Sequence, residues 1–295
     1  MTSRAVILDG YVDEPACLGV PPYISPYIRE VAGVLRDHGR EVRYLSIDQL
    51  RSDPSLFPEI DRTDLLVMIA GLTVPGAYLG GKPATLTEIE QVGSFVRHPT
   101  KVIGGPILFG YAPEGGRRAV QQTISGFDVF LQGSPAEALD AYLSGGEANG
   151  EVDYARADRW LVLGAGIIQE HPSFPSLMCE LETGRGCSRT IAGGCAFCTE
   201  RLYGLPRYRS IEGIAAEVEA LYRNGARHFR LGRQPDLLVY GADGEEFPEP
   251  RPELLDRLFS AIREAAPDLS TLHIDNVNPG TIARHEDASR AALQA

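Results

Sequence analysis

Short apolar runs alternate with stretches of helical periodicity through the first half of the sequence, and this alternation restricts the fold more than any other feature. Apolar runs that predict strands lie at 5–10, 41–47, 64–71, 101–106 and from 128. Helices are expected at 25–39 and from about residue 85, and the last strand leads into a helix that ends near residue 145. This order predicts an α/β fold class with a doubly wound parallel sheet, close to the five-stranded arrangement and covered on both faces.

Local signals place the ends of two of these helices. Ser25 is the expected N-cap of the helix at 25–39, Pro26 its first residue and Gly39 its stop, with charged residues opposite the apolar face. Thr85 and Glu88 form a capping-box pattern at the start of the other helix. That helix is expected to bury Ile89, Val92, Phe95 and Val96.

The same rhythm returns after residue 178. Strands are expected at 178–183, 227–232 and 271–280, with helices that begin at Ser210 and Pro252. Three strands separated by two helices are typical of part of a (β/α) barrel, whose active sites lie at the C-terminal ends of the strands. The residues between the halves are Gly-rich and acidic, which predicts an exposed linker with a short strand at 159–166. The expected domains are therefore 1–145 and 178–295, joined by a linker at 146–177.

The composition restricts the partners and the compartment. A net charge of −12 repels a phosphate backbone, so we expect no nucleic-acid partner. The most apolar run, which begins at Leu65, falls short of the roughly 20 residues of a membrane helix. The first residues lack the pattern of a secretory signal. We therefore expect a cytoplasmic, reducing location and no membrane partner.

Three of the five cysteines, Cys187, Cys195 and Cys198, follow the strand at 178–183 within one loop. In a reducing compartment such a group is more typical of metal binding or catalysis than of disulfides. Three thiolates suit an iron–sulfur cluster that keeps one iron open. The glycines that let the backbone wrap closely around such a cluster are Gly184, Gly186, Gly193 and Gly194.

A zinc site is the alternative for these cysteines. Adding Cys179 gives the spacing C-x7-C-x7-C-x2-C, which supplies the four thiolates of a tetrahedral structural site in a non-catalytic protein. In the iron–sulfur interpretation Cys179 is a small core residue, and Cys17 is a free thiol. The sequence leaves both interpretations open.

The strand that runs into "ETGRGC", the three-cysteine loop, the aromatic Phe197 before the third cysteine and the βα units that follow resemble the radical S-adenosylmethionine (SAM) superfamily. The resemblance covers residues 178–295 and implies a [4Fe–4S] cluster on Cys187, Cys195 and Cys198. In that family the open iron chelates SAM, and an electron donor drives its cleavage to a 5′-deoxyadenosyl radical that attacks a substrate, here unidentified. The family's barrel usually has six βα units and this sequence shows about three. We therefore expect a partial barrel, either truncated or completed by a partner, and an inactive cluster-binding fragment is a further alternative.

The resemblance also implies contacts with SAM. It places Phe197 beside the adenine, the end of the second strand near the SAM amino group, and the end of the third strand near the ribose or carboxylate. The implied cofactor-binding residues are Phe197, Gly232, Arg233, Gln234, Asn276 and Asn278.

The first 145 residues resemble the cobalamin-binding domains that precede the barrel in one radical SAM class. The segments "AGLTVPG" at 70–76 and "VIGGP" at 102–106 fall where those domains contact the cofactor, so cobalamin is a second candidate cofactor. The motif D-x-H-x-x-G, which supplies a histidine to cobalt, is replaced by "DGYVDE" at 9–14. The resemblance therefore implies cobalamin binding without that histidine.

Two glutamates, Glu180 and Glu182, point to one face of the strand at 178–183 because side chains alternate along a strand. They either meet SAM or substrate, or form ion pairs with Arg185, Arg189 or Arg233.

Two histidines have structural and functional interpretations. His171 either reaches an inter-domain cleft or is structural. His273 is expected in the core or the barrel wall.

Overall fold

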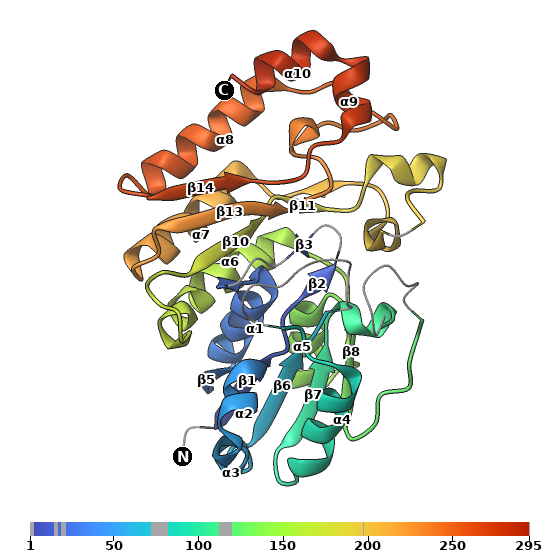
Figure 1. Ribbon diagram of the computed structural model, residues 1–295. Helices are drawn as coiled ribbons and strands as arrows, with labels where there is room; N and C mark the ends of the chain where they lie inside the picture. The colour runs from blue at the N-terminus through green and yellow to red at the C-terminus, as the bar shows by residue number, and fades with distance from the viewer. Residues whose placement is uncertain are drawn as a thin grey trace.

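The computed structural model describes residues 3–14, 17–18, 22–71, 82–111, 120–196 and 198–294. Each half of the chain contributes a parallel sheet, and the second sheet stands beyond the C-terminal ends of the strands of the first (Figure 1). The α/β class predicted from the sequence is confirmed.

The first sheet has six parallel strands in the order β5-β1-β6-β7-β8-β9. Their bounds are β1 (Arg4–Asp9), β5 (Glu41–Ser46), β6 (Leu65–Ile69), β7 (Thr100–Gly104), β8 (Val129–Gly133) and β9 (Asn149–Gly150). The first five have the doubly wound order in which the chain starts near the middle and turns back. The sequence predicted about five strands, and the two-residue β9 adds a sixth.

Helices cover both faces of this sheet. They are α1 (Pro26–Asp37), α2 (Ile47–Ser52), α3 (Phe57–Ile60), α4 (Leu86–Phe95) and α5 (Pro135–Leu143), with the 3₁₀ turns η1 (Pro54–Leu56) and η2 (Pro106–Phe109). Strand β1 shows the two faces, since Ala5 and Ile7 join one hydrophobic core, and Val6 and Leu8 the other. The core that contains Ile7 continues into the second sheet, where it includes Leu231.

The helix ends follow the local signals of the sequence. Helix α1 begins at Pro26 after an extended Ser25, and Gly39 beyond its end has φ +69°. Thr85 and Glu88 form the expected capping box of α4. The prediction that Phe95 is buried was wrong: it is 57% exposed and packs edge-on against the partly buried ring of Phe57. The other three expected core residues of this helix, Ile89, Val92 and Val96, are buried.

The stretch predicted as an exposed linker with a short strand is mainly helical. It contains α6 (Tyr154–Gly164) and η3 (Ala165–Glu170), and Trp160 and Leu161 are buried in the core. The strand prediction at 159–166 was wrong because a short apolar run does not distinguish a strand from a buried helix. Contact with α1 favours a helix over a strand in this stretch. Asp153 caps α6 by accepting from the Ala155 amide. The domain bounds themselves remain a prediction.

Helices α1 and α6 touch through their backbones at two glycines. A Cβ on Gly33 would lie 1.9 Å from the carbonyl oxygen of Trp160, and a Cβ on Gly164 would lie 1.9 Å from that of Arg29. Any larger residue at either position would therefore force the two helices apart.

The second sheet has four parallel strands in the order β14-β13-β10-β4. Strands β10 (Met178–Glu182), β13 (His228–Arg233) and β14 (Thr271–Ile274) come from the second half of the chain, whereas β4 (Tyr23–Ile24) comes from the first. Because β4 leads directly into α1, this strand links the two sheets. Within the described residues, β14 pairs only with β13.

Helices and short elements complete the second half. The helices are α7 (Ile211–Arg223), α8 (Pro252–Ala265), α9 (Pro279–Arg284) and α10 (Glu286–Ala292), with the 3₁₀ turn η6 (Leu237–Val239). The strand predicted at 271–280 ends at Ile274, and the sequence did not reveal α9 and α10. A small hairpin of β2 (Asp13–Glu14) and β3 (Cys17–Leu18) follows β1. In the part of the chain that the structure describes, no helix has both the length and the hydropathy of a membrane span.

The glycine contact between α1 and α6 gives a stability prediction. We expect Gly33→Ala to lower the free energy of unfolding by about 2 kcal/mol, because the added methyl group overlaps the rigid backbone of Trp160. Gly166→Ala in η3 is the control, since its Cβ would meet only side-chain atoms of Asn224 and Arg36, at 3.2 Å and 3.5 Å. Urea unfolding of both variants measures the effect. Equal losses at the two positions would contradict the close helix contact.

Candidate functional site

The three clustered cysteines lie on a loop that leaves the C-terminal end of β10 and returns to pair with itself. Strand β11 (Gly184–Arg185) pairs antiparallel with β12 (Arg207–Tyr208) at the base of the loop. Between them lie the 3₁₀ turns η4 (Ser188–Ala192) and η5 (Thr199–Tyr203). The amide of Cys187 donates to the carbonyl of Gly204 at 3.0 Å, which draws the two arms together above the base. The local chain therefore holds the cysteines in a closed loop.

Glycine is required at the first turn of this loop. Gly186 has φ +85°, and a Cβ there would lie 2.4 Å from the carbonyl oxygen of Leu205. Gly193 and Gly194 also have positive φ, +90° and +70°. Side chains at these positions would be strained, so the glycines that the sequence singled out do shape the loop.

Each of the three thiols has an N–H donor. The amide of Arg189 donates to Cys187, the guanidinium Nη1 of Arg189 donates to the Cys195 Sγ at 3.2 Å, and the amide of Glu200 donates to Cys198. Burial raises the pKa of Cys187, and it raises the pKa of Cys198 to about 11; the charges of Cys187 and Cys195 act on Cys198 in the same direction. The three thiols are thus electrostatic neighbours. N–H donors on all three favour the anionic sulfur that a metal requires.

Both metal interpretations of the three cysteines remain predictions. Among the described residues, no three His, Cys, Asp or Glu side chains are placed to hold one metal ion. Cys179 lies fully buried on β10, where burial raises its pKa to about 12 and the nearby charges are those of Arg29 and Glu217. This environment favours the interpretation of Cys179 as a core residue.

The residues predicted to contact SAM gather at the ends of β13 and β14, next to the cysteine loop. The Asn276 amide donates to the carbonyls of Gly232 at 3.1 Å and Gln234 at 2.8 Å, and so ties the two strand ends together. Gln234 in turn donates to the carbonyls of Leu231 and Asp275. Phe197 lies outside the described residues.

A small cavity joins part of this set to the cysteine loop. Its lining includes Cys187, Gln234, Asp236 and Asn278, and its volume of about 20 Å³ corresponds to roughly one water molecule. Asn278 also caps α9 by accepting from the Gly280 amide at 2.9 Å. The structure therefore brings Gln234 and Asn278 beside a cysteine, whereas their contact with SAM remains a prediction.

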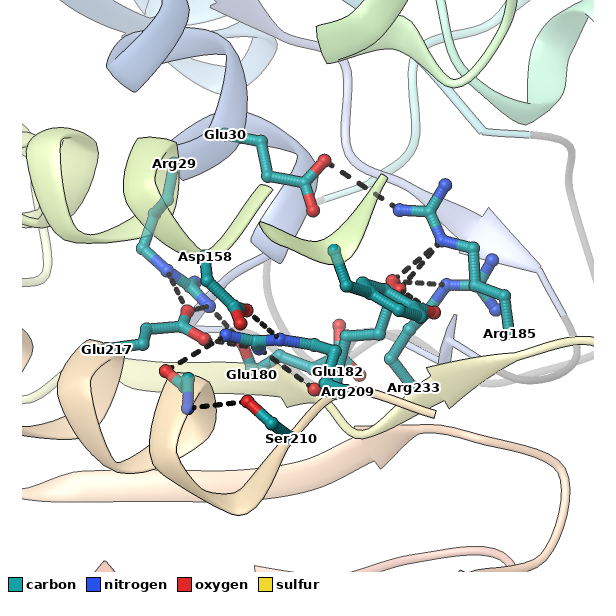
Figure 2. Close-up of polar contacts among 12 residues, drawn as sticks. Arg29, Glu30, Asp158, Glu180, Glu182, Arg185, Arg209, Ser210, Glu217 and Arg233 are labelled. Atoms are coloured by element: carbon teal, nitrogen blue, oxygen red, sulfur yellow. Dashed lines mark hydrogen bonds and ion pairs between the residues drawn. The ribbon is translucent and has the colours of Figure 1, made fainter. Parts of the chain in front are cut away.

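Beneath the loop, a buried ion-pair network joins α1 to the second sheet (Figure 2). Glu217 on α7 accepts from Arg29 at 2.7 Å and from Arg209 at 2.6 Å, and all three side chains are buried. Arg209 also pairs with Asp158 at 2.7 Å. Arg29 also donates hydrogen bonds to the carbonyls of Ile24 on β4 and Glu180 on β10. One side chain of the first half therefore holds two strands of the second sheet.

A second group of pairs surrounds Glu182. Its carboxylate accepts from Arg185 at 2.8 Å, lies 3.7 Å from Arg233 and accepts from the Tyr154 hydroxyl at 3.0 Å. The ion-pair interpretation of Glu182 with Arg185 and Arg233 is therefore confirmed. Arg189 pairs instead with Glu246 at 3.6 Å.

Sequence reasoning missed most of this network, and it placed the charges of α1 wrongly. Charged residues were expected opposite the apolar face of α1, but Arg29 and Glu30 are both buried because this helix lies between α6 and the second sheet. A helix buried on every side carries charge only where partners exist. Their partners, Glu217 for Arg29 and Arg185 for Glu30, lie 188 and 155 residues away in the sequence, so no local pattern reveals them.

The two histidines have structural environments. His171 is buried against the Tyr44 ring, its Nδ1 accepts from the Ser173 amide at 3.1 Å, and burial lowers its pKa to about 4. This placement agrees with the structural interpretation. His273 does not lie in the core: it is exposed on β14 and pairs with Asp275 at 2.7 Å, and its place in a barrel wall remains a prediction.

The D-x-H-x-x-G motif of cobalamin-binding domains would lie at the end of β1, where it is absent from this sequence. The side chains at this position form hydrogen bonds within the protein. The Asp9 carboxylate accepts from the Tyr11 amide at 2.8 Å and from the Tyr44 hydroxyl at 3.0 Å. Tyr11 stands in the position of the motif's histidine, and its hydroxyl donates to Asp48. Gly105 has φ +99°, and a Cβ there would meet the Ala70 carbonyl at 2.5 Å, so packing alone requires this glycine. Most of the segment 70–76 lies outside the described residues.

Comparison with known proteins gives relatives and structural neighbours. No family model matches the chain. It is 41% identical over 291 residues to an uncharacterized protein of Archaeoglobus fulgidus and 39% identical over 302 residues to one of Methanocaldococcus jannaschii. These matches cover 99% and 98% of this chain but 52% and 55% of the relatives, so the chain spans about half the length of the curated relatives it matches. A 79-residue segment is 40% identical to the ribosomal protein uS12 methylthiotransferase RimO of Petrotoga mobilis, and covers 26% of this chain and 17% of that protein.

Two solved structures share the fold. TsrM, a radical SAM methyltransferase from Kitasatospora setae with a tryptophan substrate and a SAM analogue bound, aligns over 91% of this chain and 53% of its own, with a TM-score of 0.56 and 15% identity. The cobalamin-dependent SAM radical enzyme OxsB, in its apo form, aligns over 99% of this chain and 41% of its own, with a TM-score of 0.54 and 13% identity. At these identities the likeness shows the fold alone.

The buried Glu30 gives a pH-dependent prediction. Burial raises the pKa of Glu30 to about 7, although Arg185, at 3.8 Å, lowers it. The folded protein thus holds Glu30 protonated more strongly than the unfolded chain does, and this stability is lost as the pH rises. We expect Glu30→Gln, which stays neutral, to gain unfolding free energy relative to wild type between about pH 5 and about pH 8 in urea titrations. If the difference in unfolding free energy between Glu30→Gln and wild type did not change with pH, this would contradict a neutral Glu30 in the folded protein.

Proposed function

We propose that this protein is a radical SAM enzyme in which Cys187, Cys195 and Cys198 bind a [4Fe–4S] cluster. The observation that carries the proposal is the closed loop at the end of β10, in which each of the three thiols has its own N–H donor. The shared fold supports it, since TsrM has been solved with cobalamin and a [4Fe–4S] cluster bound and with a SAM analogue bound.

When bound, such a cluster supplies the electron that cleaves the sulfonium of SAM. This chain's residues would hold the thiolates in place. The Arg189 guanidinium and the amides of Arg189 and Glu200 stabilise sulfur in its anionic form. The ion pairs beneath the loop are buried, which fixes the floor of the site in position.

SAM would bind between the cysteine loop and the ends of β13 and β14. Of the predicted contacts, Gln234 and Asn278 are the best placed, because both line the cavity beside Cys187. That cavity holds roughly one water molecule, so a nucleoside would enter only as the lining side chains move apart. Phe197, Gly232, Arg233 and Asn276 complete the set carried by the resemblance, with Arg233 and Asn276 held in internal hydrogen bonds.

The first sheet and its helices would form a cobalamin-binding-like domain next to this site. TsrM and OxsB, with the same fold, are described with cobalamin. If a corrinoid binds here, the tyrosine at position 11 leaves cobalt without a histidine from the D-x-H-x-x-G position. The four parallel strands of the second sheet would be part of a barrel, and the substrate and the electron donor remain to be identified.

Anaerobic reconstitution with iron and sulfide tests the proposal. We expect wild type to take up about four irons per chain and, on reduction, to convert SAM to 5′-deoxyadenosine. Cys198→Ala should lose the iron, because one of three ligands is removed. Cys179→Ala is the matched control and should retain it, because Cys179 is a buried strand residue.

Two results would contradict the proposal. A protein that carries one zinc per chain, and loses it in Cys179→Ala, would be a structural zinc protein. A protein that holds the iron cluster but leaves SAM intact would be a cluster-binding chain without the activity.

A further inference from the structure

The two ends of the cysteine loop meet at one carboxylate. Glu200 lies two residues after Cys198, and its Oε2 accepts from the amide of Gly186, the residue before Cys187, at 2.8 Å. Its Oε1 accepts from the Nη1 of Arg233 at the end of β13. Glu200 is fully buried. This single side chain thus connects both outer cysteines to the second sheet.

Arg233 is itself fixed from several sides. Its Nη2 donates to the hydroxyl of Tyr27 on α1 at 3.0 Å, and its guanidinium lies 5.1 Å from the ring centre of Tyr203. The hydroxyls of Tyr27 and Tyr203 lie 3.2 Å apart. Tyr203 packs edge-on against Phe109 in η2, the turn that follows β7. The loop is therefore held by contacts with both halves of the protein.

Electrostatics make this arrangement costly to disturb. Both members of the Glu200–Arg233 pair are fully buried, and a buried charge that loses its partner is strongly destabilising. Each carboxylate oxygen of Glu200 accepts a hydrogen bond from a different donor. A movement of the loop that separates Cys187 from Cys198 would have to break one of these hydrogen bonds.

We propose that Glu200 and Arg233 are positioning residues that hold Cys187 and Cys198 at the separation a cluster requires, before the cluster binds. The claim that this separation serves a cluster rests on the proposed function. The claim that Glu200 and Arg233 set the separation of the two thiols is independent of it, because the contacts lie within the polypeptide. Neither side chain needs to touch iron in this role.

Glu200→Gln is the informative variant. Glutamine keeps the shape of the side chain but offers one acceptor oxygen in place of two, so either Gly186 or Arg233 faces an NH₂ group. Glu217→Gln is a matched control, because Glu217 is equally buried and also accepts from two separate donors, Arg29 and Arg209. It lies on α7, outside the cysteine loop. Loss of stability alone should affect both variants alike.

The first measurement uses the metal-free protein. In a background in which Cys17 and Cys195 are replaced by serine, a bifunctional bimane that fluoresces only after it bridges two thiols reports the proximity of Cys187 and Cys198. We expect Glu200→Gln to slow bridging about tenfold, the effect of one lost charge-assisted hydrogen bond, with Glu217→Gln unchanged. Equal rates in the parent and Glu200→Gln, equal slowing in both variants, or no bridging in the parent would overturn the proposal.

The second measurement uses the reconstituted protein with all its cysteines. We expect Glu200→Gln to lose iron to a chelator about tenfold faster than wild type, as second-layer partners of metal ligands typically affect affinity by this factor or more. Glu217→Gln should release iron at the wild-type rate when compared at equal folded fraction by circular dichroism. If wild type takes up no iron but the bimane rates differ as expected, the proposed function fails while the positioning role stands. If wild type takes up iron and both variants release it alike, the positioning role fails.

Discussion

The buried ion pairs between α1 and the second sheet are the interaction on which the rest of the structure depends. Arg29 donates to the carbonyls of Ile24 and Glu180 and pairs with Glu217, so one guanidinium joins α1 to two strands of the second sheet, β4 and β10, and to α7. A charge in such a place is tolerated only while its partners stay in place. This requirement, together with the glycine contact of α1 with α6, makes the two sheets one packed unit with a continuous core.

The charges around Glu182 carry the same constraint into the cysteine loop. Arg185 and Arg233 share Glu182, and Arg233 also reaches Glu200, which binds the amide before Cys187. The thiols therefore lie on a short loop whose floor cannot shift without uncovering a buried charge. Such rigidity suits a site that must receive an inorganic group without rearrangement. The cavity beside Cys187 is too small for a ligand as large as SAM, so its lining side chains would still have to move.

Features encoded by neighbouring residues could be predicted from the sequence, and features that depend on distant contacts could not. The alternation of strands and helices in the first half, the Thr85 capping box and the grouping of three cysteines after β10 all follow from local patterns. The residues at 159–166 gave an ambiguous apolar run that contact with α1 resolves as a helix. Likewise, β4 is only two residues long, and only pairing with β10 defines it. Arg29 and Glu30 resembled an exposed helical face, because their partners come from other elements of the fold.

The central claim is that three thiols in this loop hold a four-iron cluster with one iron open to SAM. Electron paramagnetic resonance of the reconstituted, reduced protein tests it most directly. The account predicts the signal of a reduced [4Fe–4S] cluster that changes when SAM is added, because SAM would occupy the open iron. A protein with no such signal, or with a signal that SAM leaves unaltered, would contradict the account.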